Sequence, residues 1–372
     1  MLWEEVLSGL ANFTPGQALM MLIGGVLIYL AIKKGMEPVL LLPIGLGIIL
    51  ANIPLSGMHD EGEGIFWLLK QAGLKTELFP LLIFIGIGAM IDFGALLERP
   101  LTVLLGAAAQ FGIFGTMLLA LALGFPLNEA ASIGIIGSAD GPTSIYVASI
   151  LAPNLLGPVA VAAYSYMALV PIIQPPIMKL LTTNAERKIR MSTGSRSVSK
   201  TTKILFPLAA IVVTGLLTPK ATPLIGMLMF GNLMRESGVV PRLASTAENE
   251  MVNIVTILLG ITVGSTMTAT TFLRTDTILI FIMGILAFSI GTAAGVVFGK
   301  VMCHLSGRRV NPLIGAAGIS AFPMSARVVQ KVGLQADPHN HLLMHAVGAN
   351  TAGQVASAVA GGALLTLVLG VL

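Results

Sequence analysis

Long apolar runs, separated by short polar turns, recur along nearly the whole 372-residue sequence. A helix that crosses the hydrocarbon core of a bilayer, which is about 30 Å thick, needs about 20 predominantly apolar residues. The runs predict about ten crossing helices, near residues 17–34, 36–54, 79–97, 101–123, 156–181, 203–219, 221–234, 252–270, 277–300 and 341–365. Residues 1–16, with Trp3, Glu4 and Glu5, predict a short interfacial helix before the first crossing.

Two further apolar stretches, near 127–152 and 311–333, are interrupted by glycine, proline and polar residues.

Of all residues, 55% are hydrophobic and only 10% are charged, against about 25% charged in a soluble domain. A soluble globule is therefore excluded. The net charge of +4 is too small and too clustered to indicate a nucleic-acid partner. The sequence predicts an all-α polytopic membrane protein.

Basic residues predict the orientation of the chain, because cytoplasmic loops carry an excess of lysine and arginine. The loop 182–202 is predicted to be cytoplasmic because it contains Arg187, Lys188, Arg190, Arg196 and Lys200. Lys33 and Lys34, after the first run, also belong inside, which places the N-terminus outside. The loop stays inside only if 127–152 is a hairpin that enters and leaves on the outer face. Counting the crossings after this loop in the same way makes 311–333 a hairpin that is entered from the cytoplasm.

The second half of the chain resembles the first. Residues 225–238 match residues 44–57 at an offset of 181. GSTMTATTFL matches GAMIDFGALL at an offset of 176, and SAFPMS matches SADGPTS at an offset of 182. These matches predict two repeats, 17–181 and 203–365, each with five crossings and a hairpin. Because five is odd, the second repeat is inverted, and inverted repeats with interrupted helices are typical of transporters, whose ion sites lie at the interruptions.

The first interruption, GSADGPTS, places Asp140 in the middle of an apolar stretch. A charge at membrane depth costs about 2.5–3.5 kcal/mol on insertion scales, so it needs a partner or a neutral form. Glycine and proline free backbone carbonyls there, and Ser138, Thr143 and Ser144 add oxygens. The set is suited to a small hard cation such as sodium. The alternative is a helix kink in which Asp140 is protonated or paired internally.

The second interruption, NPLIGAAGISAFPMSAR, offers the oxygens of Asn311, Ser320 and Ser325, and Gly315 permits close backbone approach. Arg327 cannot serve a cation site, but its guanidinium suits an anionic carboxylate. The alternative for Arg327 is an anchor at the cytoplasmic end of its segment.

Two amides and a tyrosine in the later apolar runs are also candidates. Asn350 and Gln354 are costly in apolar surroundings, and Asn350 is a candidate ion ligand. Tyr166 lies centrally in its run, which favours a hydroxyl facing the bundle interior over a place in an interfacial belt. Small residues spaced by four in the same helix as Asn350 predict a smooth packing face: Gly353, Ser357 and Gly361.

Motifs for other energy sources are missing from the sequence. It contains no GxxxxGK[ST] loop for nucleotide hydrolysis, no HExxH motif for zinc and no biotin-attachment signature of the MKM type. The energy source must therefore be an ion gradient or a partner that carries the reactive group.

GSADGPTSIY, NPLIGAAGISAFPMSAR, GANTAG and FIGIGAMIDFG together resemble the β subunit of the sodium-pumping decarboxylases. These are biotin-dependent complexes that act on oxaloacetate, methylmalonyl-CoA or glutaconyl-CoA, and the resemblance covers nearly the whole chain. It implies that Asp140, Asn311 and Asn350 bind sodium, with Gly315 in the same region. It further implies that Ser320 and Tyr166 take part in a second sodium or proton path, and that Arg327 contacts carboxybiotin.

The function that this resemblance implies is the coupling of carboxybiotin decarboxylation to sodium export, with consumption of a proton. The implied partners are a biotinylated carrier subunit, a carboxyltransferase subunit and a small membrane subunit, in the inner membrane of the cell. The alternative is a sodium-coupled secondary transporter, either a carboxylate symporter or a sodium/proton antiporter.

Overall fold

The computed structural model describes residues 7–35, 37–192 and 198–371, and within these ranges it contains helices and no strand. Trp3, Glu4, Glu5 and Arg196, which entered the predictions above, lie outside the described residues. The first half of the chain contains α2 (Ser8–Ala11), α3 (Pro15–Lys34), α4 (Pro38–Ala51), α5 (Ile65–Leu69), the π-helix η1 (Lys70–Lys75), α6 (Leu78–Met90), α7 (Gly94–Glu98), the 3-10 helix η2 (Pro100–Thr102), α8 (Val103–Ala109), α9 (Phe111–Ala122), α10 (Leu127–Gly134), the 3-10 helix η3 (Ile135–Ser138), α11 (Gly141–Leu151), η4 (Pro153–Leu155) and α12 (Leu156–Leu181).

The second half begins after the basic loop. It contains α13 (Asn184–Arg187), α14 (Lys200–Leu217), η5 (Pro219–Ala221), α15 (Thr222–Ser237), α16 (Pro241–Thr246), the π-helix η6 (Ala247–Met251), α17 (Val252–Ser265), α18 (Ala269–Phe272), α19 (Thr275–Leu305), the 3-10 helix η7 (Pro312–Gly318), α20 (Met324–Ala336) and α21 (Leu343–Leu369). Local signals set many of these boundaries. For example, Thr14 and Gln17 form a capping box before α3, and Gly35 ends that helix in the left-handed conformation.

Every predicted run contains a helix, but several helices are shorter than the runs. By length and composition alone, the described residues include five stretches able to cross a membrane: Pro15–Lys34, Pro100–Ala122, Lys200–Leu217, Thr275–Leu305 and Leu343–Leu369. Two bent helix pairs raise this number to as many as seven. The run at 79–97 is divided because Ile91 is extended and Asp92 accepts a hydrogen bond from the Gly94 N–H at 2.7 Å. The all-α fold and the membrane class are thus confirmed.

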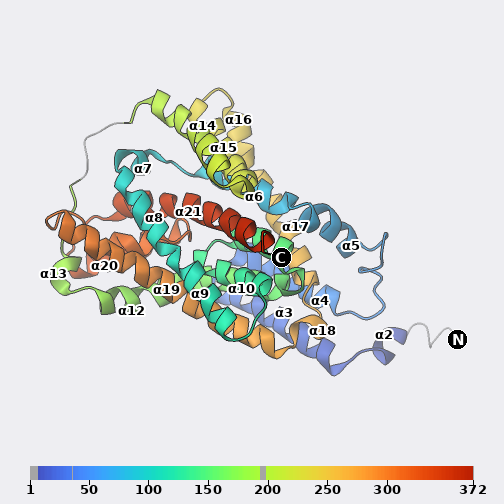
Figure 1. Cartoon of the computed structure of the whole chain (residues 1–372). Helices are drawn as coiled ribbons and strands as arrows, with labels where there is room; N and C mark the ends of the chain where they lie inside the picture. Colours follow the sequence, from blue (N-terminus) through green and yellow to red (C-terminus); the bar gives the residue numbers. More distant parts are fainter. Residues whose placement is uncertain (1–6, 36, 193–197, 372) are drawn as a thin grey trace.

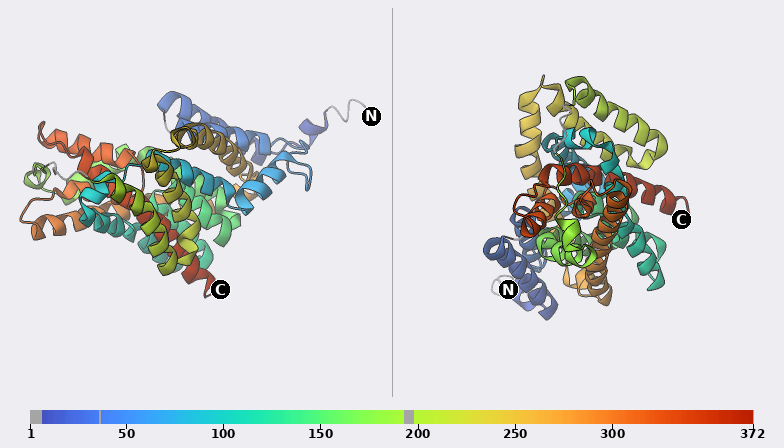
Figure 2. Two further views of the ribbon diagram at one scale, coloured as in Figure 1. Left: turned by 90° about the horizontal axis from the view of Figure 1, so that it is seen from above. Right: turned by 90° about the vertical axis from the view of Figure 1, so that its left-hand side faces the viewer.

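The helices form two bundles, and the first is a row. In it α14 packs against α15, α15 against α6, α6 against α17, α17 against α4, and α4 against α3. In the right-hand view of Figure 2, α3 lies at the lower left and α14 at the top, at the two ends of this row. Glycines permit the closest approaches. A Cβ added at Gly88 would lie 1.8 Å from the Leu228 carbonyl oxygen, and one at Gly264 would lie 2.2 Å from that of Ile44.

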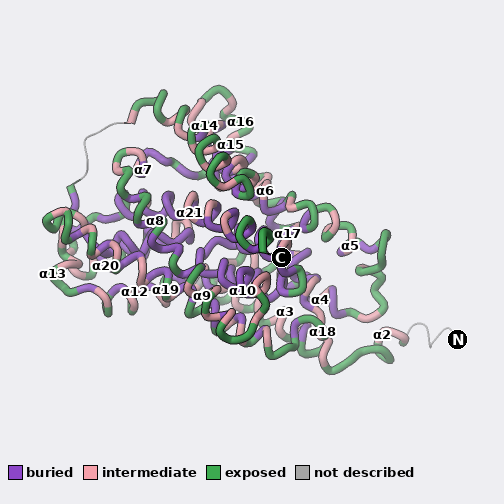
Figure 3. Tube along the Cα trace, in the orientation of Figure 1, coloured by how far each residue is buried: buried purple, intermediate pink, exposed green. Residues whose placement is uncertain are grey.

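The second bundle contains the two interrupted segments. Its helices are α8, α9, α12, α19 and α21, which pack around η3, α11, η7 and α20. Figure 1 shows α12, α19 and α20 at the lower left, away from α14 and α15. Residues 130–148 and 311–321 are all buried, and Figure 3 shows this interior against the exposed residues of α14. The interrupted segments therefore form the core of this bundle.

The two ends of each interrupted segment lie close together. Asn128 Nδ2 donates to the Leu151 carbonyl oxygen, and Asn154 Nδ2 donates to Glu129 Oε1, both at 2.9 Å. In the second segment, Asn311 and Asn340 both donate to the Arg187 carbonyl oxygen, at 3.0 and 2.8 Å. Each segment thus enters and leaves the bundle at one place.

Basic segments gather at one end of the molecule, on the left in Figure 1. Lys203 Nζ lies 2.9 Å from Asp92 Oδ1, and the Arg99 guanidinium donates to the Ser192 carbonyl oxygen. Arg190 pairs with Asp337 at 2.7 Å. The hydrogen bond from Arg190 and its positive charge hold the pKa of Asp337 below its usual range. The entrance of the second interrupted segment lies at this basic end.

Candidate ion site

The two interruptions touch at their midpoints. The Ser320 N–H donates to the Ser138 carbonyl oxygen at 2.9 Å. On the first segment, η3 ends at Ala139, whose φ of 56° reverses the chain, and Asp140 is extended. On the second, η7 ends at Ile319, which is also extended. Extended backbone at both interruptions leaves carbonyl oxygens without helical partners in the buried core.

Asp140 is buried at this contact, with 2% of its surface exposed. It caps α11: Oδ1 accepts from the Thr143 N–H at 3.1 Å, and Oδ2 accepts from Ser357 Oγ at 2.6 Å. None of the ion pairs among the described residues involves Asp140. A buried carboxylate is thus held by neutral donors and the N-terminus of a helix, which leaves its charge without a partner ion.

One face of α21 joins the two interruptions. Asn350 Nδ2 donates to the Ile319 carbonyl oxygen at 2.7 Å, and Gln354 Nε2 donates to that of Ser320. The Ser320 hydroxyl in turn donates to the Gly353 carbonyl oxygen at 2.8 Å. The spacing of small residues predicts that Ser357 lies on a smooth packing face, but this interpretation is incomplete because the Ser357 hydroxyl binds Asp140.

The two glycines of that face do pack closely. A Cβ added at Gly353 would lie 2.3 Å from the Gly318 carbonyl oxygen, and one at Gly361 would lie 2.9 Å from Thr143 Cγ2. Both contacts let α21 approach the interrupted segments, as the spacing of small residues predicts.

Several buried oxygens on the residues in contact with the interruptions have no hydrogen-bond partner. They include Asn350 Oδ1 and Gln354 Oε1. Leaving a buried polar atom unpaired costs about 1–3 kcal/mol, so these oxygens are available to a ligand bound at the contact. One carboxylate with neutral oxygens suits a hard monovalent cation, because a single positive charge balances the single negative one. Among the described residues, no group of three or more His, Cys, Asp or Glu side chains is placed to hold a metal ion.

Asn311 and Gly315 lie on the same segment but make other contacts. Asn311 Oδ1 accepts from the Leu313 N–H at 3.0 Å, and Nδ2 donates to the carbonyls of Arg187 and Ile189. Its side chain therefore holds the basic loop at the entrance of the segment. A Cβ added at Gly315 would lie 1.9 Å from the Gly295 carbonyl oxygen of α19. The absence of a side chain there lets η7 contact α19.

Tyr166 and Tyr164, on α12, point to different places. The Tyr166 hydroxyl donates to the Phe281 carbonyl oxygen, and its ring packs against Gly284 of α19. The structure does not place this hydroxyl at Asp140. Tyr164 packs against Gly141 instead, beside Asp140, and the sequence analysis did not select it. Helix periodicity alone does not show which of the two tyrosines faces the interruption.

Arg327 is exposed on α20, and its guanidinium has no ion-pair partner among the described residues.

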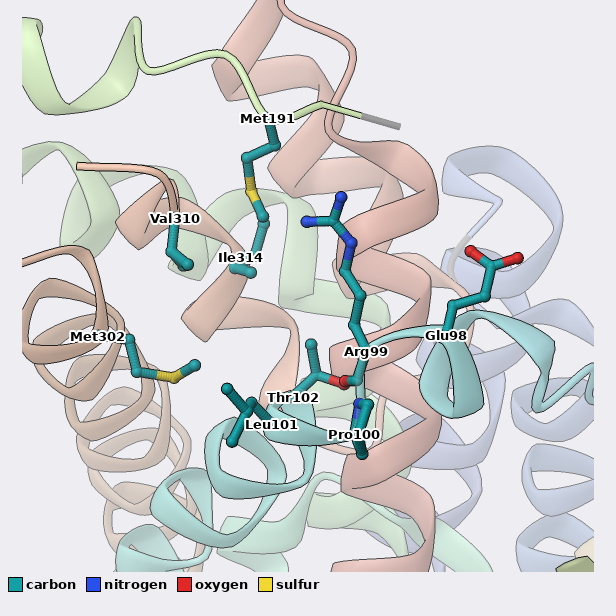
Figure 4. Close-up of a pocket in the computed structure, with 9 residues that line it drawn as sticks. All are labelled: Glu98, Arg99, Pro100, Leu101, Thr102, Met191, Met302, Val310 and Ile314. Carbon is teal, nitrogen blue, oxygen red and sulfur yellow. The ribbon is translucent and has the colours of Figure 1, made fainter. Parts of the chain in front are cut away.

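A cavity of about 380 Å³ also opens at the basic end of the molecule. In Figure 4 the Arg99 guanidinium points toward Met191, whereas the Glu98 carboxylate points away. The other residues that line the cavity are Pro100, Leu101, Thr102, Met302, Val310 and Ile314. The cavity is an apolar space with a guanidinium at its rim.

Comparisons with known proteins cover nearly the whole chain. Residues 16–368 match the family described as Na+-transporting oxaloacetate decarboxylase beta subunit. The chain is 55% identical to the glutaconyl-CoA decarboxylase subunit beta of Acidaminococcus fermentans, over 98% of this chain and 96% of that protein. It is 54% identical to the methylmalonyl-CoA decarboxylase subunit beta of Veillonella parvula, over 97% and 95%. It is 49% identical to the oxaloacetate decarboxylase beta chain 2 of Salmonella typhi, over 97% of each.

Proposed function

The chain belongs to the family of Na+-transporting decarboxylase β subunits, and we propose that it binds the transported sodium ion at Asp140. As a member of this family it is the membrane subunit of a biotin-dependent complex and couples decarboxylation to sodium export. The observation that carries the proposal is the buried Asp140 carboxylate, held by neutral donors where the two interruptions touch.

We also assign three further predicted site residues, two of which lie at this contact. Asn350 supplies its unpaired amide oxygen to sodium, since its amide nitrogen is already bound to Ile319. Ser320 and Tyr166 serve a second sodium or proton path. The assignment of Ser320 is supported by its position, because it lies where the two interruptions touch.

Asn311 and Gly315 belong to the cytoplasmic part of the sodium route. Asn311 lies at the basic entrance of the second interrupted segment, where its amide bridges carbonyls of the basic loop. Gly315 lies one turn further in, against α19. Ligation by Asn311 would require its amide to release the carbonyls of Arg187 and Ile189.

We propose that Arg327 contacts carboxybiotin. Its guanidinium is exposed and unpaired within the described ranges, which suits an anionic carboxylate. A carboxyltransferase subunit would load biotin on a carrier, and the carrier would dock at the basic end together with a small membrane subunit. Decarboxylation consumes a proton and releases carbon dioxide. Because moving each charge against 100 mV costs roughly 2.3 kcal/mol, the reaction must supply several kcal/mol to export two sodium ions.

We further propose the inverted-repeat topology, with about ten crossings, two hairpins, the N-terminus outside and the basic loop in the cytoplasm of a cell whose inner membrane holds the complex. In the repeat alignment, α4 corresponds to α15 and α6 corresponds to α17. A two-fold relation therefore pairs the contact of α4 with α17 to the contact of α15 with α6, and both contacts occur. Asn52 Nδ2 donates to the Met267 carbonyl oxygen at 2.9 Å. Asn232, one position before the equivalent of Asn52 at the offset of 181, donates through Nδ2 to the Ile91 carbonyl oxygen at 2.8 Å. These swapped pairs support a two-fold relation between repeats 17–181 and 203–365.

The experiment uses the complete complex, isolated through its biotinylated subunit on avidin and reconstituted in liposomes. Addition of the acid or acyl-CoA that serves as substrate should drive sodium uptake. Asp140→Asn should abolish both this uptake and sodium-stimulated decarboxylation. A symporter would instead carry sodium and a carboxylate without the biotinylated subunit. Full sodium-dependent activity of Asp140→Asn would overturn the assignment of Asp140.

A further inference from the structure

Tyr164 occupies a place at the ion site that none of the assignments above uses. Its side chain, on α12, is 2% exposed and lies against the residue that follows Asp140. A Cβ added at Gly141 would lie 2.1 Å from Cε1 and 2.3 Å from Cζ of the Tyr164 ring. Cζ carries the hydroxyl, so the hydroxyl lies at the start of α11, where Asp140 caps the helix.

The Tyr164 hydroxyl has no hydrogen-bond partner, although it is fully buried. The other tyrosines differ from it. Tyr166 donates to the Phe281 carbonyl oxygen, Tyr146 hydrogen-bonds Glu77, and Tyr29 is 55% exposed on α3. A buried phenol normally finds a partner, so an unpaired one packed against Gly141, the residue after Asp140, leaves an oxygen free for a ligand at the start of α11.

The chemistry of a carboxylate and a neutral phenol favours a metal cation over a proton as that ligand. A proton binds to one carboxylate oxygen and needs no further oxygen, whereas a sodium ion needs several. A tyrosine hydroxyl offers neutral lone pairs, so it adds a ligand without adding charge to a site already balanced by one carboxylate. Thr143, in the first turn of α11, offers a further neutral hydroxyl oxygen.

We propose that the Tyr164 hydroxyl is a ligand of the sodium ion at Asp140 and favours sodium over protons at this site. The inference rests on the proposed function, because it requires sodium to bind at Asp140. It also gives Gly141 a physical role, since any side chain at that position would displace the Tyr164 ring.

The test compares Tyr164→Phe with the unmodified chain in the purified decarboxylase complex. Removal of an unpaired hydroxyl leaves the packing of the ring intact, so we expect the variant to assemble. The sodium concentration for half-maximal decarboxylation should rise about tenfold, the effect of losing one polar contact to an ion. The rate at saturating sodium should stay close to that of the unmodified complex, and the rise should be larger at acidic pH.

The matched control is Thr116→Val on α9, which removes another buried hydroxyl without a partner. It should leave the half-maximal sodium concentration unchanged. A second measurement, independent of turnover, is the rise in thermal unfolding temperature that sodium produces. It should shrink in Tyr164→Phe and persist in Thr116→Val.

The outcomes separate the two proposals. The first outcome is that the activity of the unmodified complex depends on sodium and that of Asp140→Asn does not. In that case, a Tyr164→Phe variant with the same sodium dependence as the unmodified complex would show that the ligand role of Tyr164 is wrong. If Asp140→Asn keeps its sodium dependence, the proposed function fails first.

Discussion

At the scale of single residues, the charge of Asp140 depends on neutral donors, and Ser357 makes the shortest of these contacts at 2.6 Å. A hydrogen bond to a charged group contributes about 1.5–3 kcal/mol. The ionised carboxylate that a sodium ion needs is therefore stabilised by a serine on a different helix.

Ser357→Ala should weaken sodium binding by about 10- to 100-fold, because it removes a donor to the ionised carboxylate. The measurement is the sodium concentration for half-maximal decarboxylation by the complex. Ser149→Ala is the matched control, since the Ser149 hydroxyl bonds only the Tyr146 carbonyl of its own helix. Equal sodium dependence of the two variants would contradict a role for Ser357 at the site.

The sequence predicts part of this site. Asp140 is found because an acidic residue beside glycine and proline interrupts an apolar run. Ser357 is missed as a polar contact because a serine among glycines spaced by four also fits a packing face. Tyr164 is missed because its relation to Gly141 arises from the approach of α12 to α11, a tertiary contact that no local pattern encodes.

At the scale of elements, backbone contact between η7 and α19 shapes the second bundle. Glycines of α19 face η7 directly. A Cβ added at Gly295 would lie 2.2 Å from the Gly315 carbonyl oxygen, and one at Gly299 would lie 2.6 Å from that of Pro312. The glycines of both elements therefore fix how deep the second interruption lies.

Gly315→Ala should lower stability by about 1–3 kcal/mol, because its Cβ would lie 1.9 Å from the Gly295 carbonyl oxygen and the backbone of one element would have to shift. Thermal unfolding of the detergent-purified complex measures this change. Gly226→Ala on α15 is the control. Nothing lies within 4 Å of its added Cβ, and alanine favours helix, so its unfolding temperature should stay equal or rise. A stable Gly315→Ala variant would contradict the close packing of η7.

Apolar periodicity predicts where helices form here but not where they stop. The run at 101–123 divides at Gln110, and the run at 79–97 divides at Asp92. In the first case the Gln110 side chain bonds the Gly106 carbonyl of the preceding turn, and in the second an ion pair with Lys203 holds the bend. Such breaks depend on partners that are distant in the sequence or on side-chain conformations, and hydropathy reports neither.

In the whole molecule, we propose that the entrances of the two interrupted segments lie on opposite sides of the membrane. Asn154 marks the first entrance and His339 the second, and both residues are exposed. The midpoints of the segments meet at Ser138 and Ser320, so the ion site lies between the two entrances.

Cysteine labelling tests this topology. In a background where Cys303 is replaced by alanine, an impermeant thiol reagent added to intact cells should label Asn154→Cys and spare His339→Cys. Inside-out vesicles should give the reverse pattern. Labelling of both positions from the same side would refute the opposed hairpins and, with them, the inverted repeat.

The central claim is that sodium binds where a buried carboxylate caps a helix at the contact of two interrupted segments. Equilibrium binding of radioactive sodium to the purified complex, without turnover, tests it most directly. We expect saturable binding by the unmodified complex and its loss in Asp140→Asn, with the assembled complex otherwise intact. Sodium binding by Asp140→Asn at the level of the unmodified complex would contradict it.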